Sequence, residues 1–150
     1  MPDAAAGVDH PVLYQRVEQG DRVERLKLIS RALGSLELHA EGRIAMSVVT
    51  REDFESTGGT RGDTGGFAEI PMSISTVRVS ASLTEVARGE VRISMRSKSA
   101  DGPHPLVDVN AAARTLGGGG HIQAAGARFA GSVEDARKAV LKQLRAGLGV

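Results

Sequence analysis

Residues 77–98 read VRVSASLTEVARGEVRISMRSK, and this stretch decides the fold. Apolar and polar residues alternate on both sides of Gly89, which is the pattern of two strands with one face on a core. A one-residue slip in pairing would bury the polar side chains, so the register must pair odd-numbered with odd-numbered residues. A three-residue loop over residues 87–89 would do this, with Gly89 in the left-handed position. The stretch therefore predicts an antiparallel hairpin.

The hairpin register predicts specific cross-strand pairs on each face. They are Leu83 with Ile93, Ala81 with Met95, Ser80 with Arg96, and Arg78 with Lys98. Two cations directly opposite each other are destabilising, and an anion shared between them would remove the repulsion. The alternative is that these two long side chains lean apart into solvent, and the sequence leaves both readings open.

The remaining elements are expected on both sides of this hairpin. Helices are predicted over His10–Gln19, after Asp21 as N-cap, over Asp108–Leu116, and over Val133–Leu148 with Ser132 as N-cap. The helix after Asp21 should bury a stripe at helical spacing: Val23, Leu26, Ile29, Leu33 and Leu36. Further strands are expected over 36–40, 43–50 and 125–129, the last beside the Arg96 strand. The predicted fold class is α+β, with a mixed, largely antiparallel sheet of about five strands and helices packed against it.

The composition excludes several classes of function. The chain has 150 residues, no cysteine, 3% aromatic residues and a formal net charge of +1. Disulfides and thiolate sites are excluded, stacking of many bases on aromatic side chains is not available, and a broad surface for duplex DNA is not expected. The four histidines show no metal-ligand spacing, so no metal site is expected in this chain. Without a signal peptide or a long apolar run, a cytoplasmic location and no membrane contact are expected.

Four consecutive glycines, Gly117–Gly120, run directly into His121. One glycine would be explained as a helix C-cap, but four followed by an imidazole favour a loop that contacts a ligand. Exposed amides and an imidazole can hold an anionic oxygen together. Arg96 offers a planar fork that suits phosphate. The expected anion site combines this arginine with Ser97, Lys98, His121 and the amides of Gly118, Gly119 and Gly120, and Arg78 extends it.

The block GGGGHIQAAG, residues 117–126, resembles the glycine–histidine signature of the DHH-associated C-terminal domain. That domain is the second half of DHH phosphoesterases, among them the RecJ nucleases and the nanoRNase/pAp-phosphatase enzymes. The resemblance extends through SMRSK at 94–98, VDVN at 107–110, TREDF at 50–54 and RLKLI at 25–29. It covers nearly the whole chain and is closest to the nanoRNase type.

The resemblance implies a substrate-recognition domain that grips short RNA or a nucleotide phosphate. A separate DHH catalytic domain, N-terminal in cis or supplied in trans, would hold manganese and hydrolyse the phosphoester. His121 would contact the phosphate near the scissile bond and stabilise developing charge, and the isolated chain would be inactive. Residues 1–11 would be a disordered segment or a linker remnant of the catalytic domain, and residues 12–150 would form the recognition domain. Homodimer formation is left open.

One loop departs from the family pattern, and other functions are left open. The family usually carries a glutamate after the Asp-Thr pair and an asparagine four residues later, where this chain has Gly65 and Glu69. The alternatives are a tRNA-binding module, because a related domain closes alanyl-tRNA synthetases, a self-sufficient phosphatase that uses His121 and Asp108, and a purely structural or dimerising role.

Overall fold

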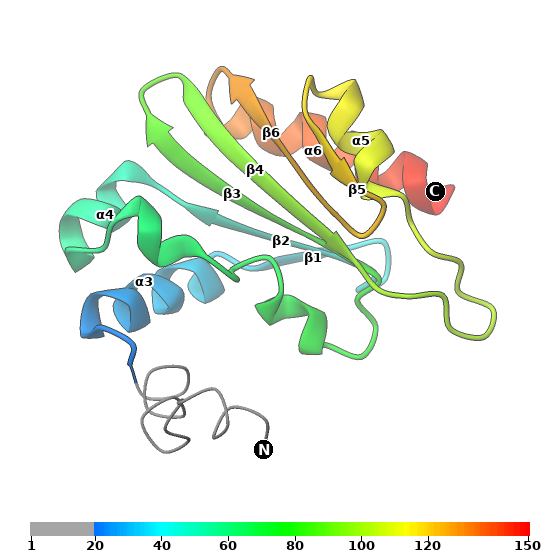
Figure 1. Ribbon diagram of the computed structural model, residues 1–150, viewed down its shortest axis with the longest axis horizontal. Coiled ribbons are helices and arrows are strands. Elements are labelled where there is room, and N and C mark those ends of the chain that lie inside the picture. The colour runs from blue at the N-terminus through cyan, green and yellow to red at the C-terminus, as the bar shows by residue number, and fades with distance from the viewer. Residues whose placement is uncertain (1–19) are drawn as a thin grey trace, which may run out of the picture.

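The computed structural model describes residues 20–150, which form one six-stranded sheet with helices on both faces (Figure 1). The strand order is β1-β2-β3-β4-β6-β5; β2 and β3 are parallel and the other neighbours are antiparallel. The strands are β1 Glu37–His39, β2 Ile44–Val49, β3 Val79–Ala87, β4 Glu90–Ser97, β5 Gly119–His121 and β6 Ala124–Ala130. The helices are α3 Val23–Gly34, α4 Arg51–Thr57, α5 Val109–Thr115 and α6 Val133–Leu148. The predicted α+β class is confirmed, and the predicted helix over residues 10–19 lies outside the described residues.

The register of the β3–β4 hairpin is the one that the alternation predicts. Leu83 pairs with Ile93, Ala81 with Met95 and Ser80 with Arg96, and the Lys98 amide donates to the Arg78 carbonyl at 2.9 Å. The turn differs from the prediction. Ala87 pairs with Glu90, so the loop has two residues, and a β-bulge between Glu85 and Ala87 restores the odd-with-odd register. Gly89 adopts a φ of 76°, as a left-handed turn position requires.

The second half of the glycine run, with His121, forms the edge strand β5. β6 pairs with β4, as predicted, and β5 pairs with β6 at the edge of the sheet. The sequence predicts a ligand-contacting loop at this place, because four glycines and a histidine exceed what a helix C-cap requires. Here the chain needs glycine to bring two backbones close together, as the site geometry below shows.

The two faces of the sheet differ in chemistry, and each is covered by different helices. Figure 1 shows α5 and α6 on one side and α3 and α4 on the other. The α5–α6 side holds the larger core, where the odd-numbered residues of β3 and β4 meet the buried stripe of α6, formed by Ala136, Val140 and Leu144. The Ser132 hydroxyl accepts from the Asp135 amide and caps α6, as predicted. The opposite face is the polar one.

The start of α3 differs from the sequence expectation. Its buried residues are Leu28 and Ala32, which join Val49 and Phe67 in a second, smaller core. From the predicted stripe, Val23, Leu26 and Leu33 are exposed by 57%, 53% and 42%, respectively. Asp21 does not cap the helix; its carboxylate accepts from Arg25 instead, and the N-cap position is Arg22. The helix is thus rotated so that a different face packs on β2.

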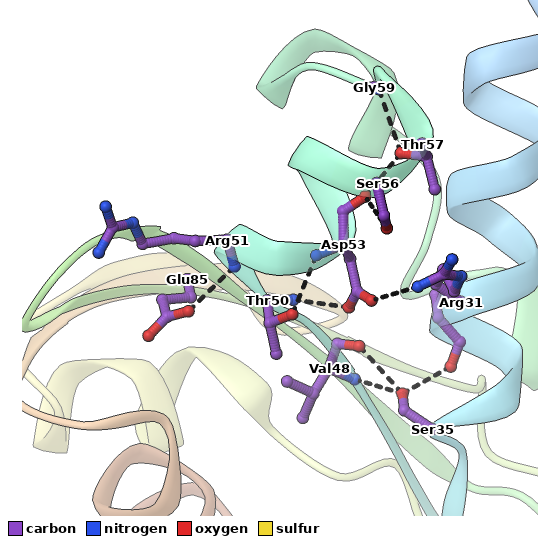
Figure 2. Close-up of polar contacts among 11 residues, drawn as sticks. Arg31, Ser35, Val48, Thr50, Arg51, Asp53, Ser56, Thr57, Gly59 and Glu85 are labelled. Carbon is purple, nitrogen blue, oxygen red and sulfur yellow. Dashed lines mark hydrogen bonds and ion pairs between the residues drawn. The ribbon is translucent and has the colours of Figure 1, made fainter.

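A polar network joins α3, β2 and α4 (Figure 2). Thr50 and Asp53 form a reciprocal capping box at the start of α4, and Arg31 of α3 donates to the same aspartate at 3.4 Å. The Ser35 hydroxyl, just after α3, accepts from the Val48 amide at 2.8 Å. These contacts fix α3 against the edge of the polar face.

The edge strand β1 is tied to α6 by an ion pair between residues far apart in sequence. Arg137 donates through Nε to Glu37 at 2.7 Å and makes a second contact through Nη2. The hydrogen bond from Arg137 lowers the pKa of Glu37 against the opposing effect of burial, and a hydrogen bond to His39 lowers it further.

We expect Glu37→Gln to reduce the free energy of unfolding by about 1 kcal/mol or less at pH 7. The folded-state pKa is lowered, so this stabilisation is full above the ordinary pKa of 4.5 and shrinks as the pH falls toward the folded-state value. Urea denaturation of wild type and variant at several pH values measures it. Glu134→Gln is the matched control, because Glu134 contacts the same arginine at 3.4 Å with a side chain 61% exposed. A wild-type advantage over Glu37→Gln that grows on acidification would contradict this account.

Candidate functional site

Arg96 and His121 lie in one cross-strand row. Ser80 of β3 pairs with Arg96 of β4, Arg96 with Ala124 of β6, and Ala124 with His121 of β5. Two strand spacings separate the α-carbons of Arg96 and His121 by about 10 Å. The histidine is exposed. The register thus brings Arg96 and His121, which the sequence singles out, to the same end of the sheet, with the histidine on its edge strand.

Arg96 is already engaged by a carboxylate. Its Nε donates to Glu69 in a short hydrogen bond, and its Nη1 donates to the Met95 carbonyl at 2.8 Å. An arginine has five N–H donors, so three remain for a ligand among the contacts described. Glu69 stands where the family usually has asparagine, and the structure gives this departure a physical role. Glu69 orients the guanidinium and competes with any anion for it.

The glycines of the run are needed for close backbone approach. A β-carbon on Gly118 would lie 2.1 Å from the Gly126 carbonyl oxygen, and one on Gly120 would lie 2.6 Å from the Ala124 carbonyl oxygen. The Gly118 amide donates to Ala113 at 2.8 Å, and the Gly120 amide donates to the Asn110 side chain at 2.9 Å. Both donors therefore have acceptors within the protein, and a phosphate-binding role for the amides of the run stays a prediction. Asn110 holds β5 in place.

Arg78 and Lys98 are neighbours, as predicted, and each donates to a backbone carbonyl, while the Arg78 Nε is buried without a partner among the described residues. Arg78 donates through Nη2 to Ser99 at 2.7 Å, and the Lys98 ammonium donates to Ile74 at 2.9 Å. Burial lowers the pKa of Lys98, and the charge of Arg78 lowers it further. Arg78 is only 7% exposed, so its side chain does not lean into solvent, and an anion shared with Lys98 stays a prediction.

Ser97 lies apart from the other predicted site residues. It pairs with Val79 and is 5% exposed, so its row belongs to the core-facing side of the sheet. Its hydroxyl lies 3.5 Å from the Ile122 carbonyl oxygen. The side chain does not share the face of Arg96.

A pocket of about 290 Å³ opens on the polar face beside Arg96. The even-numbered residues of β3 and β4 form its floor, and the connection that follows α4 forms its roof. Its lining includes Arg61, Gly66, Glu69, Ser82, Thr84, Arg92, Ser94 and Arg96. The alternation in the sequence puts these serines and arginines on one polar face, but of the pocket-lining residues only Arg96 is predicted as a site residue. The same alternation could have predicted the floor of the pocket. Small hydroxyl side chains beneath a glycine-rich loop do not fill the space between the sheet and the loop.

The arginines at the start of α3 hold the roof of the pocket in place. Arg22 donates to both carboxylate oxygens of Asp63, at 2.9 and 2.8 Å. Arg25 donates to the Gly65 carbonyl at 2.8 Å and lies over the Phe67 ring at 5.6 Å. Hydrogen bonds from the Thr60 backbone, and then from Arg22, lower the pKa of Asp63. The roof is therefore built before any ligand arrives.

Among residues 20–150, no three His, Asp or Glu side chains are grouped so that they could hold a metal ion. In the same part of the chain, no helix combines the length and the apolar character needed to cross a membrane.

We expect Gly118→Ala to destabilise the protein by about 2–4 kcal/mol, or to detach β5, because the new methyl group would collide with the β6 backbone. Gly119→Ala is the matched control, because its β-carbon would meet only the Asn110 side chain, at 3.6 Å. Thermal unfolding and amide hydrogen exchange in β5 and β6 measure the difference. Equal stability of the two variants would contradict the packing described for the run.

We expect Glu69→Gln to tighten binding of a nucleoside 3′,5′-bisphosphate several-fold at low ionic strength, because it removes the carboxylate that competes for Arg96. The free energy of unfolding should change by less than about 1 kcal/mol, as for other exposed pairs. Isothermal titration measures the affinity. Glu52→Gln on α4 makes the same charge change on an exposed surface, and an equal gain in both variants would rule out a specific role for Glu69.

Comparison with known proteins agrees with the sequence resemblance. The family model described as the DHHA1 domain matches residues 41–146. An exopolyphosphatase-related protein from Bacteroides fragilis superposes with a TM-score of 0.80 at 27% identity, over 95% of this chain and 40% of that chain. The chain therefore spans less than half the length of that relative.

Two more distant structures share the fold. The pGpG-specific phosphodiesterase PggH from Vibrio cholerae gives a TM-score of 0.51 at 12% identity, over 84% of this chain and 39% of that one. The C-Ala domain of alanyl-tRNA synthetase from Aquifex aeolicus gives 0.51 at 12% identity, over 71% of this chain and 91% of that one. The family match covers more than half of the chain, and the row that carries Arg96 and His121 lies within it. The chain belongs to the DHHA1 family, the DHH-associated C-terminal domains.

Proposed function

We propose that this chain is the substrate-recognition domain of a DHH-family phosphoesterase. It binds short RNA or a nucleotide phosphate and presents the phosphoester to a separate metal-dependent catalytic domain. The observation that carries the proposal is the row from Arg96 to His121, which brings a guanidinium and an exposed histidine within two strand spacings of each other. Membership of the DHHA1 family supports the same role.

The chemistry of the row suits phosphate. Arg96 keeps N–H donors for two phosphate oxygens after its contacts with Glu69 and Met95, and a charge-assisted hydrogen bond to phosphate is among the stronger polar contacts. The His121 ring can donate to a further oxygen and stabilise charge that develops there. A net charge of +1 limits the number of phosphates held, which favours a short ligand over a tRNA.

The hydrolytic groups belong to a partner domain in this proposal. Residues 20–150 contain no group of three or more His, Asp or Glu side chains that could hold a metal ion. A DHH catalytic domain, N-terminal in cis or supplied in trans, would bring manganese and the attacking water. The role of this chain is to bind the substrate and fix its orientation.

Titration of the full chain with a 5′-phosphorylated ribodinucleotide and with tRNA tests the proposal. Wild type should bind the dinucleotide, and His121→Ala and Arg96→Gln should each weaken binding by about 1.5–3 kcal/mol, roughly tenfold or more. His104→Ala, in an exposed loop, is the matched control and should bind like wild type.

Activity and ligand preference provide the contrary outcomes. The chain alone, with manganese added, should not hydrolyse the dinucleotide. Turnover by the pure chain that His121→Ala abolishes would favour a self-sufficient phosphatase. Tighter binding of tRNA than of the dinucleotide would favour a tRNA-binding module.

A further inference from the structure

The floor of the pocket beside Arg96 consists of hydroxyl groups without protein partners. Among residues 20–150, the side chains of Ser82, Thr84 and Ser94 make no hydrogen bond, although Ser82 and Thr84 are only 5% and 7% exposed. The Ser80 hydroxyl, in the Arg96 row, is buried and unpartnered as well. Buried hydroxyls almost always have a partner in native proteins, and the Ser80 oxygen lacks one. The hydroxyls of Ser82, Thr84 and Ser94 line the pocket and can donate to or accept from a polar molecule above them.

The walls of the pocket carry more positive than negative charge. Arg96 is matched by Glu69, and Asp63 is matched by Arg22. Arg61 and Arg92, both exposed and both lining the pocket, have no carboxylate partner among the residues that the structure describes. Two guanidinium groups facing a cavity without counter-ions attract an anion, and arginine favours phosphate.

The size and rigidity of the pocket narrow the class of ligand. A cavity of about 290 Å³ lies at the lower end of the range for small-molecule sites, which is room for a sugar phosphate rather than for an oligonucleotide. Arg22 and Arg25 hold the roof in place, so little ordering is needed on binding. Hydroxyls both donate and accept, which suits a ribose, while the arginines suit its phosphate.

We propose that this pocket is a second anion-binding subsite, which takes a phosphoribose unit further along the chain than the phosphate held by Arg96 and His121. This placement rests on the proposed function. Arg92 and Arg96 are four residues apart on one strand, about 13 Å between α-carbons. Consecutive phosphates of a nucleotide chain, like the two phosphates of a nucleoside 3′,5′-bisphosphate, flank one ribose and lie much closer together than this. The subsite therefore makes the domain select a chain that carries a third phosphate, such as a 5′-phosphorylated trinucleotide, over a single nucleoside bisphosphate.

Arg92→Gln tests the subsite by ligand length. Wild type should bind a 5′-phosphorylated ribotrinucleotide more tightly than a nucleoside 3′,5′-bisphosphate. The variant should lose about tenfold in affinity for the trinucleotide, keep its affinity for the bisphosphate, and show a salt dependence of trinucleotide binding lower by about one phosphate contact. Arg88→Gln is the matched control, because it makes the same charge change at the hairpin turn outside the pocket. An equal loss in both variants, or an equal loss for both ligands, would overturn the subsite.

A second measurement separates this proposal from the proposed function. Ribose 5-phosphate is titrated into the His121→Ala variant, and amide shifts are followed by NMR. We expect the amides of Ser82, Ser94 and Gly66 to shift in that variant as in wild type, and Ser94→Val to abolish the response. If ribose 5-phosphate shifts these amides in His121→Ala but wild type does not bind the dinucleotide, the subsite is supported and the proposed function is contradicted. No response in either protein would defeat the pocket.

Discussion

The register that runs from β3 across β4 and β6 to β5 is the constraint on which the rest of the structure depends. Because side chains alternate along each strand, one register decision sorts every residue of these strands to one of two faces. Odd-numbered residues of β3 and β4 build the core with α5 and α6, and even-numbered ones form the polar face. The glycines of the run permit the pairing of β5 with β6. The two backbones lie so close together that there is no room for a β-carbon at Gly118 or Gly120.

Stability and the candidate site share the same contacts on the polar face. Leu28 of α3 is fully buried in the smaller core with Phe67, and the arginines of the same helix hold the loop that roofs the pocket. The apolar packing thus positions a polar cavity. The fold holds the hydroxyl and guanidinium groups around this cavity in place, and they remain available to a ligand.

The sequence predicts the hairpin register and α6 well because both rest on local physics. Only one register of β3 with β4 keeps all the apolar side chains on one face of the sheet. The N-cap of α6 is equally local, because the Ser132 side chain itself accepts from the Asp135 amide. The face of α3 was predicted wrongly because Val23, Leu26 and Leu33 form as regular a stripe as the residues that the sheet covers. β5 was missed because glycine propensity says nothing about the close approach of a neighbouring backbone.

The site was predicted in part for the same reason. Arg96 and His121 could be singled out by residue type and by resemblance, whereas the Glu69 contact joins a loop to a strand 27 residues away. No local pattern reports a contact of that kind. The pocket roof could not be predicted from the sequence either, because it depends on a hydrogen bond between Arg22 and Asp63, which are 41 residues apart.

The central claim is that the end of the sheet around Arg96 and His121 receives a phosphorylated nucleotide. Chemical-shift mapping of the full chain with a 5′-phosphorylated ribodinucleotide tests it most directly. The account predicts shifts in β4, β5 and the pocket roof, with α6 unchanged. Shifts confined to Lys138, Lys142 and their neighbours on α6 would contradict it.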